Sequence, residues 1–387
     1  MTIKPLLIAL ALAWATAPLA RAADNFIKGA DISTLAEVER QGGKFYNEAH
    51  QSQDAIAILR ANGFNAVRLR LWVDPYDSAG KPYGGGTNDL ATTLALAKRA
   101  KAQGMQLLLD FHYSDFWTDP GKQYKPKSWQ GLSFTQLQTR LHDYTRDTMQ
   151  AFKAAGVTPD MVQIGNEINS GILWPEGKSW GEGGGEFDRL ATLLKAAISG
   201  LRETLARPDE VKIMLHLAKG TKNDDFRWWF DEITRRGVPF DLIGLSMYTW
   251  WDGPISALKA NMDDISQRYH KDVIVVEAAY AWTLDNCDAA ENSFQQKELQ
   301  DGGYPASPQG QAAYLRDLLG AVRAVPDGRG KGVFYWEPTW IVAPGNTWAT
   351  PVGMKYIHDE WKQGNARENQ ALFDCQGRVL PSIHVFR

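Results

Sequence analysis

Short apolar runs rich in β-branched residues alternate along the chain with longer segments whose apolar residues recur every three or four positions. The short runs predict eight strands, at 27–33, 66–71, 106–112, 161–166, 212–217, 242–248, 273–277 and 332–336. The longer segments predict helices between them, at 53–61, 90–103, 136–155, 187–205, 226–236, 255–269 and 311–325. Four of these helices precede a glycine that is expected to form a left-handed C-cap: Gly63, Gly104, Gly156 and Gly237.

Strands and helices that alternate eight times predict an α/β fold, a (β/α)8 TIM barrel with enlarged βα loops. A doubly wound open sheet is the alternative, but no Gly-x-Gly-x-x-Gly follows the first strand and no Pro- or Ser-rich linker divides the chain. We therefore expect a single domain over residues 23–387. The longest connections, at 72–87, 113–135, 169–186 and 278–308, all follow the carboxyl end of a strand, where barrel enzymes build their active sites.

Residues 1–22 are typical of a secretory signal peptide, with Lys4, an apolar run over 5–19 and the small-residue pattern Ala20-Arg21-Ala22. A transmembrane anchor is the alternative, but the run is shorter than the ~20 residues that a spanning helix needs. We expect a secreted protein, either extracellular or periplasmic. An oxidising compartment would allow Cys287 and Cys375 to pair, and two unpaired thiols are an equal alternative.

Charge and composition narrow the possible partners. Lys and Arg number 42 against 45 Asp and Glu, and the formal net charge of −3 provides no long-range attraction to nucleic acid or anionic lipid. We expect neither as a partner, and we expect a monomer. The chain has 35 glycines and 15 tryptophans, many of them in the loops after strands, which suits a flat, amphipathic ligand.

Two glutamates stand at the ends of apolar strands, Glu167 after the fourth and Glu277 at the seventh. Strands on opposite arcs of a barrel can aim side chains across one mouth, so a carboxylate pair is predicted there. Such a pair can hydrolyse a glycosidic bond, with retention when the carboxyl groups are about 5–5.5 Å apart and with inversion when they are further apart. A salt-bridged strand-end residue is the alternative for either glutamate alone.

Polar residues at neighbouring strand ends favour the catalytic interpretation. Asn166 offers an amide to a sugar hydroxyl. Rings that can position the carboxylates end three other strands: His112, Tyr248 and Trp336. Of Arg68 and Arg70, one is expected to point into the barrel mouth and keep a carboxylate ionised, and an outward-facing side chain is the alternative for the other.

Seven longer strings carry a resemblance to a known family. They are GADIS (29–33), NAVRLRLW (65–72), DFHYSDFW (110–117), DPGKQ (119–123), QIGNEI (163–168), YWEP (335–338) and NQALFD (369–374). Together they resemble glycoside hydrolase family 53, the arabinogalactan endo-β-1,4-galactanases, over residues 26–386. The resemblance implies a clan A barrel that hydrolyses a polysaccharide, the β-1,4-galactan of pectin, by a retaining double displacement.

The resemblance also implies roles for individual residues. Glu167 matches the acid/base and Glu277 the nucleophile, while Asn166 and Arg68 match residues near the cleavage point. Three residues match the lining of subsite −1: His112, Tyr248 and Trp336. Tryptophans suit the apolar face of galactose, and we expect stacking from Trp117, Trp250, Trp72 and Trp251, each with core packing as the alternative.

Two segments depart from the family pattern. Ala366-Arg367-Glu368 precedes Asn369-Gln370 where a tryptophan is common, and Leu217-Ala218-Lys219-Gly220 follows the fifth strand in place of the usual sequence. Some bacterial members bind structural calcium, for which the loop after the seventh strand offers Asp285, Asp288 and Asp301. The Asp-x-Asp-x-Asp-Gly ligand rhythm is lacking, and the sequence has neither His-Glu-x-x-His nor a phosphate loop, so we expect no catalytic metal and no cofactor.

Two other functions compete with galactan hydrolysis. The same barrel and carboxylates would serve a clan A retaining enzyme on another β-1,4-glycan, such as mannan or glucan, because subsites decide specificity. A barrel that binds polysaccharide without cleaving it is the second alternative. The presence of both Glu167 and Glu277 argues against it.

Overall fold

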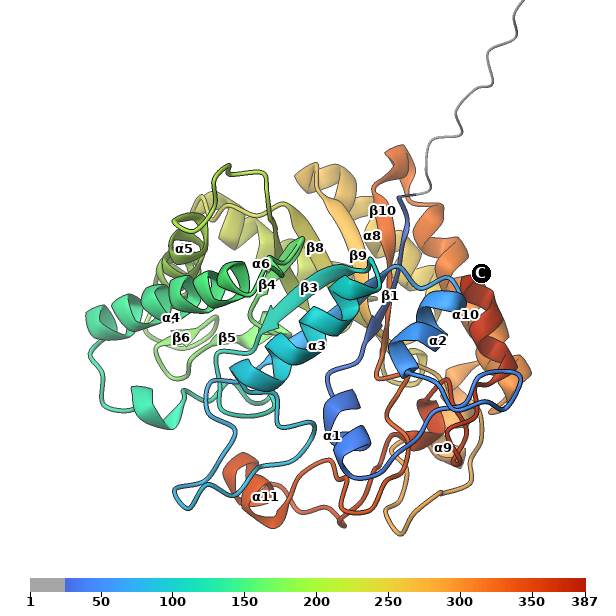
Figure 1. The fold of residues 1–387 in the computed structure, drawn as a ribbon. Helices are drawn as coiled ribbons and strands as arrows, with labels where there is room; N and C mark the ends of the chain where they lie inside the picture. Colours follow the sequence, from blue (N-terminus) through green and yellow to red (C-terminus); the bar gives the residue numbers. More distant parts are fainter. Residues whose placement is uncertain (1–24) are drawn as a thin grey trace, which may run out of the picture.

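The computed structural model describes residues 25–387, so the predicted signal peptide lies outside the described residues. Eight parallel strands form a closed barrel in the order β1-β10-β9-β8-β7-β4-β3-β2 (Figure 1). They are β1 Ile27–Asp31, β2 Ala66–Leu71, β3 Gln106–Phe111, β4 Met161–Ile164, β7 Lys212–Leu217, β8 Leu242–Met247, β9 Asp272–Ala278 and β10 Gly330–Trp336. A small antiparallel hairpin, β5 Gly171–Ile172 with β6 Gly177–Lys178, lies in the loop after β4. The predicted (β/α)8 barrel is confirmed.

Seven helices correspond to those that the sequence predicts. They are α2 Ala55–Ala61, α3 Leu90–Ala102, α4 Phe134–Ala154, α5 Glu186–Arg202, α6 Asn223–Arg235, α8 Ile255–Tyr269 and α10 Pro308–Arg323. The predicted cap glycines after four of them have φ between 65° and 97° (Gly63, Gly104, Gly156 and Gly237). Side chains cap the amino ends of α2, α3, α4 and α10, for example Asp54, which accepts the Ala57 N–H, and Ser133, which forms a capping box with Gln136.

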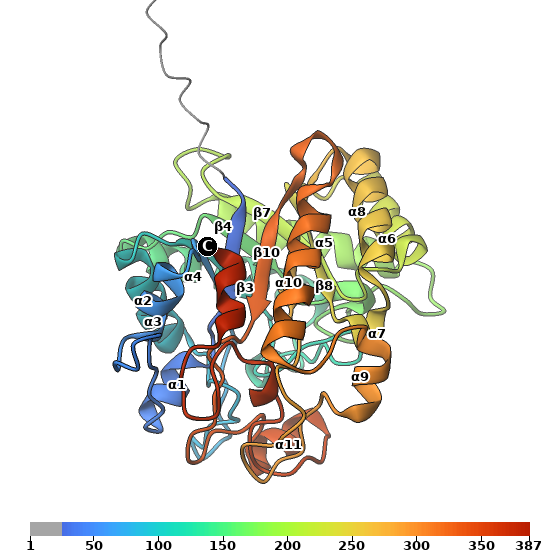
Figure 2. The same cartoon turned by 90° about the vertical axis from the view of Figure 1, so that its right-hand side faces the viewer.

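The sequence analysis missed four short helices and five single 3-10 turns. The helices are α1 Leu35–Arg40, α7 Thr249–Asp252, α9 Gln296–Gly302 and α11 Pro351–Ile357. The turns are Lys127–Trp129, Ile168–Ser170, Pro326–Gly328, Glu368–Gln370 and Pro381–Phe386. The views in Figures 1 and 2 both place α1, α9 and α11 at the end of the barrel to which the strand arrows point. These elements are too short to produce a helical period in the sequence. Of them, α1, α9 and α11 stand at the face where the site lies.

The barrel interior changes from apolar to polar along the strands. Its amino-terminal layer is a separate apolar cluster of Ile27, Ala66, Leu108, Met161, Met214, Leu242, Ile274, Val276 and Phe334. Along a strand, every second side chain points to the same face of the sheet. Four buried polar residues stand two positions after a member of this apolar cluster: Arg68, Asp110, Gln163 and His216. The apolar layer therefore forms the floor beneath a polar network.

Strand β9 contains a register shift that decides where Glu277 points. Leu245 of β8 pairs with Val275, but the next residue, Ser246, pairs with Glu277, so Val276 is an extra residue in β9. Val276 belongs to the interior cluster, and regular alternation would turn Glu277 outward, towards the surrounding helices. The bulge instead turns the carboxylate inward, next to Ser246.

A disulfide joins Cys287, in the loop after β9, to Cys375 near the C-terminus, with their Cα atoms 5.7 Å apart. Of the two alternatives left open by the sequence, the structure therefore has the bonded pair. Among residues 25–387, no helix combines the length and the apolar character needed to span a bilayer.

Two glycine-to-alanine changes should shift stability in opposite directions. At Gly29, inside the barrel, a Cβ would lie 2.2 Å from the Phe334 ring, so Gly29→Ala is expected to lower the free energy of unfolding by about 1–3 kcal/mol. At Gly320, exposed on α10 with nothing within 4 Å, the same change is expected to raise it by about 0.5–1 kcal/mol. Urea denaturation of both variants measures this, and a Gly29→Ala protein as stable as wild type would contradict the packing.

Candidate active site

A cleft of about 720 Å³ opens at the carboxyl ends of the barrel strands. Most of the residues that the sequence proposes for the site line it: Arg68, His112, Trp117, Asn166, Glu167, Tyr248, Trp251, Glu277 and Trp336. Trp72 and Trp250 do not.

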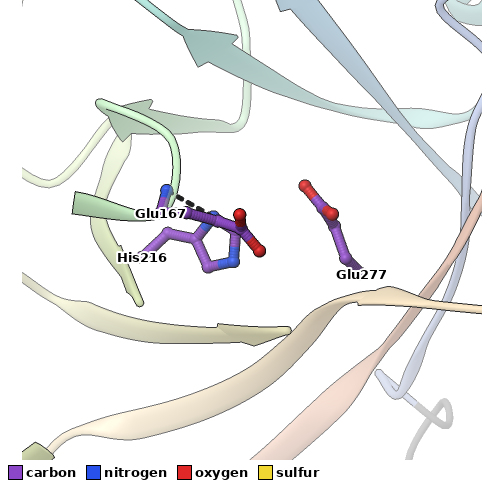
Figure 3. A group of neighbouring side chains, drawn as sticks. All are labelled: Glu167, His216 and Glu277. Atoms are coloured by element: carbon purple, nitrogen blue, oxygen red, sulfur yellow. Dashed lines mark hydrogen bonds between the residues drawn. The ribbon is translucent and has the colours of Figure 1, made fainter. Parts of the chain in front are cut away.

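Glu167 and Glu277 face each other across this cleft (Figure 3). One carboxylate oxygen of each, together with a ring nitrogen of His216, lies within 4.8 Å of the others. Glu167 follows the end of β4 in the left-handed region, with φ 50° and ψ 52°. Such strain in a residue other than glycine is characteristic of functional positions. The two carboxylates are thus near enough to act on one bond.

A single buried arginine organises the base of the cleft. The Arg68 side chain is 1% exposed, and each of its five N–H groups has an acceptor. The acceptors are Asp31 Oδ2 at 2.8 Å, Glu277 Oε1 at 2.9 Å, Asp110 Oδ2 at 2.8 Å, Asn166 Oδ1 at 2.8 Å and Gln163 Oε1 at 3.2 Å. Arg68 therefore fixes the positions of Glu277 and Asn166 at once.

Glu277 has two partners that favour its charged form. Besides the Arg68 guanidinium, the Tyr248 hydroxyl donates a hydrogen bond to it at 3.1 Å. The pKa of Glu277 is raised, mainly by burial and also by the negative charges of Asp31 and Asp110, while the Arg68 charge and the Tyr248 hydrogen bond oppose that rise. Burial also raises the pKa of Tyr248 well above its ordinary value, so the hydroxyl keeps its proton and donates it.

Glu167 has no such cation. Burial, and after it the negative charge of Glu277, raise the pKa of Glu167 well above its usual range. Only the Ser246 hydroxyl, which donates to Glu167 Oε1 at 2.6 Å, opposes the rise. When the pair holds one proton, that proton therefore resides on Glu167.

A buried histidine holds Ser246 in place. His216 Nε2 lies 2.8 Å from Ser246 Oγ, and its Nδ1 faces the Gln163 amide at 3.0 Å and the Glu167 N–H at 3.4 Å. Because both groups at Nδ1 are donors, the histidine is neutral with its proton on Nε2, from which it donates to Ser246. Burial and Arg68 lower the pKa of His216, which agrees with the neutral form. Glu167, His216 and Glu277 are the only cluster of potential metal ligands within residues 25–387, but both histidine nitrogens are already used.

His112 and Asn166 are positioned in the same way. His112 Nδ1 accepts the Trp72 indole N–H at 3.2 Å, and Nε2 donates to Asp110 at 3.1 Å, so this ring is also neutral. Burial lowers the pKa of His112. The Asn166 amide donates to the Thr118 carbonyl at 2.9 Å while its oxygen accepts from Arg68. Trp72 is fully buried beneath His112, so for this tryptophan the core alternative holds.

Arg70 does not face outward, which corrects the alternative that the sequence left open. It is two residues from Arg68 and therefore on the same interior face. Its guanidinium donates to Glu337 at 2.6 Å and to the Gly85 carbonyl at 2.9 Å. Burial raises the pKa of Glu337 to about 7, against the opposing charge of Arg70. Arg70 and Glu337 thus form a second buried charged group next to that of Arg68.

The expectation that Trp250 stacks on a sugar is wrong. Its side chain is 5% exposed and packs against Phe294 and Tyr280, with ring centroids 4.8 and 6.0 Å away. The next residue, Trp251, is 55% exposed and lines the cleft. Both belong to the short helix α7, where adjacent residues point in different directions. The loop before α11 adds Trp348, and the segment after α11 adds Trp361.

Trp117 lines the cleft but is largely covered by protein. The Trp348 ring stacks on it at 4.3 Å between centroids, and the Arg70 guanidinium also lies 4.3 Å from the Trp117 centroid. Its indole N–H donates to the Trp348 carbonyl at 3.2 Å. Trp117 therefore supports the wall of the cleft more than it offers a free face.

The comparisons with known proteins agree with this geometry. Residues 27–386 match the model of the family described as glycosyl hydrolase family 53. The chain belongs to glycosyl hydrolase family 53. It is 36% identical to an endo-β-1,4-galactanase of Bacillus subtilis, over 94% of this chain and 86% of that protein. It is 35% identical to an arabinogalactan endo-β-1,4-galactanase of Cellvibrio japonicus, over 99% and 97%. A solved family 53 catalytic domain from Ignisphaera aggregans superposes with a TM-score of 0.88 at 42% identity, over 96% and 98%.

This family 53 protein is thus a glycoside hydrolase.

The loop after β9 carries the three aspartates that the sequence offers for structural calcium. The described residues do not bring Asp285, Asp288 and Asp301 together as a group of ligand atoms. Asp288 instead accepts the backbone N–H groups of Ala290 and Asn365, at 2.7 and 2.8 Å, and so joins the loop after β9 to the C-terminal segment.

Sequence reasoning missed several residues of the hydrolase site. They are Asp31, Asp110, Gln163, His216, Ser246 and Glu337. Five of these six residues could have been found in the sequence. Each of the five lies two or four positions after an apolar residue of the interior cluster at the amino ends of the strands, and so on the same face of its strand. Glu337 could not, since its φ of 50° places it after the strand has ended.

Replacing Ser246 should change the titration of Glu167. Ser246→Ala removes the one hydrogen bond that favours the charged carboxylate, so the pKa of Glu167 is expected to rise. Carbon-13 NMR of the glutamate carboxyls across pH measures it, with the Glu167→Gln spectrum used for assignment. Ser246→Thr retains the hydroxyl and serves as the control. An unchanged or lower pKa in Ser246→Ala would contradict the arrangement.

Proposed function

We propose that this protein is a retaining endo-β-1,4-galactanase that hydrolyses the galactan of type I arabinogalactan. The observation that carries the proposal is the pair Glu167 and Glu277, whose carboxylate oxygens approach within 4.8 Å. Retaining glycosidases hold their carboxyl groups about 5–5.5 Å apart, and inverting enzymes need about 6.5–9.5 Å to admit a water. The galactanase names of relatives that align over nearly the whole chain support galactan as the substrate.

In the first step, Glu277 attacks the anomeric carbon while Glu167 gives its proton to the glycosidic oxygen. The carbon–oxygen bond of the linkage breaks, the reducing-end part leaves as an alcohol, and the glycone stays attached to Glu277 as an ester. Arg68 and Tyr248 suit this step because they keep the attacking carboxylate ionised and oriented. Asn166, beside Glu167 and fixed by Arg68, is placed to bind a sugar hydroxyl.

In the second step, the same environment makes Glu167 a base. Once Glu277 is esterified it carries no charge, and the repulsion that raised the pKa of Glu167 disappears. The carboxylate then takes a proton from water, the water oxygen bonds to the anomeric carbon, and Glu277 leaves as a carboxylate. Two inversions give a product with the β configuration of the substrate.

Substitution of the two glutamates tests this assignment on linear β-1,4-galactan. Glu167→Ala and Glu277→Ala are each expected to slow the release of reducing ends by at least about 10²-fold while remaining folded by circular dichroism. Asp359→Ala, a carboxylate of the same cleft outside the pair, is the matched control and should retain most activity. Proton NMR of the first wild-type product should show the β-anomer.

An α-anomer as the first product would overturn the nucleophile role of Glu277. Cleavage of mannan or cellulose in preference to galactan would overturn the substrate, and binding of galactan without any cleavage would overturn hydrolysis of galactan itself.

The pH profile should report the raised pKa of Glu167. Because the protonated form is needed in the first step, kcat/KM is expected to fall as pH rises through that pKa. An aryl galactobioside with a good leaving group needs no acid, so for Glu167→Gln on this substrate the fall at high pH should vanish. A fall that persists would assign it to another group.

We also propose that the protein is exported and acts as a monomer, with residues 1–22 removed as a signal peptide. The bonded pair Cys287 and Cys375 supports an oxidising destination.

A further inference from the structure

One arginine of the cleft has three aromatic rings around its guanidinium. Arg367 lies between α11 and the 3-10 turn Glu368–Gln370, and it lines the cleft. Its guanidinium carbon is 5.4 Å from the ring centroid of Trp251, 5.5 Å from that of Trp336 and 5.3 Å from that of Trp348. Within residues 25–387, no acceptor forms a hydrogen bond or ion pair with this guanidinium. Its donors are therefore free for a ligand.

The backbone around Arg367 fixes where these donors are presented. Its N–H donates to Asn365 Oδ1 at 3.0 Å, and its carbonyl accepts the Gln370 N–H at 2.9 Å. The carbonyl of Ala366 accepts the Ser293 N–H at 2.8 Å, which connects this segment to the loop after β9. These backbone hydrogen bonds therefore hold Arg367 in place in the wall of the cleft.

The position of Arg367 in the barrel indicates which part of the substrate it meets. Trp251 follows β8 and Trp336 ends β10, and β9, which carries Glu277, lies between these strands. In the double displacement the glycone bonds to Glu277, while the leaving group departs beside Glu167. Arg367 therefore faces the glycone, one or more sugars beyond the bond that is cleaved.

The chemistry of the free group indicates what it binds. A guanidinium presents a planar fork that matches a carboxylate with two parallel hydrogen bonds, and the charge makes these bonds stronger than bonds to neutral hydroxyls. Aromatic rings attract the guanidinium by cation–π interaction, which leaves its N–H groups available to a ligand. Lys297 of α9 also lines the cleft and has no ion pair among the described residues. The charges of Glu167 and Glu277 attract Arg367 but leave its N–H groups without a hydrogen-bond acceptor, and such a free guanidinium favours a carboxylate on the sugar over a neutral hydroxyl.

We propose that Arg367 binds the carboxylate of a uronic acid in the glycone part of the polysaccharide, so that the enzyme cleaves acidic galactan chains at a set distance from that unit. This site rests on the proposed function, since it places the glycone by the roles of Glu167 and Glu277.

Three substrates test the proposal: a β-1,4-galactan hexasaccharide, the same chain with one galactose oxidised at C6 to the carboxylate, and the methyl ester of that acid. Wild type is expected to show a kcat/KM for the acid about tenfold above that for the ester, and to cut the acid mainly at one linkage. Arg367→Gln should lose both the preference and the fixed cut, and Arg367→Lys should keep part of them. Raising the salt concentration should weaken the wild-type preference.

Arg316→Gln, at an exposed arginine of α10 away from the cleft, is the matched control and should behave as wild type. Equal cleavage of acid and ester by wild type, or an undiminished preference in Arg367→Gln, would overturn the Arg367 site and leave the galactanase assignment intact. Cleavage of none of the three substrates would overturn both proposals.

Discussion

The architecture of the active site depends on one buried cation, the guanidinium of Arg68. Two aspartates and the candidate nucleophile share its charge, and two amides complete its hydrogen bonds. A charge removed from water is tolerated only when it is paired and every donor is satisfied, so these groups must fold together or not at all. The five partners arise from four strands or their ends, β1, β3, β4 and β9, which makes the arginine a common reference point for the mouth of the barrel.

That shared cation also creates the difference between the two glutamates. Both lie in the same cleft, yet only Glu277 contacts the positive charge of Arg68, while Glu167 faces the negative charge of its partner. Their unequal affinities for a proton follow from position alone, because the residues are chemically identical. The neutral histidine His216 adds no charge and so leaves this asymmetry intact, acting only through the hydroxyl of Ser246.

The sequence was sufficient for the barrel because the strands are short and mainly apolar runs, as burial on both faces requires. It was also sufficient for the glutamate pair, since few strands end in an ionisable residue. The alternation of side chains along a strand would have placed Asp110 and His216 in the barrel interior as well. It could not separate Trp250 from Trp251 on a four-residue helix, nor find α9 or α11, whose folding depends on the loops they pack against. The pairing of cysteines 88 residues apart was equally beyond local patterns.

The bulge in β9 has a consequence for anyone who transfers this site to another scaffold. Val276 and Glu277 both present side chains to the interior, one to the floor and one to the cleft, and a regular strand cannot do this with consecutive residues. The position of the candidate nucleophile therefore depends on the length of the strand as much as on the identity of the residue. An idealised barrel that copied the glutamate along with every neighbour, but with even pleating, would aim it at the helices.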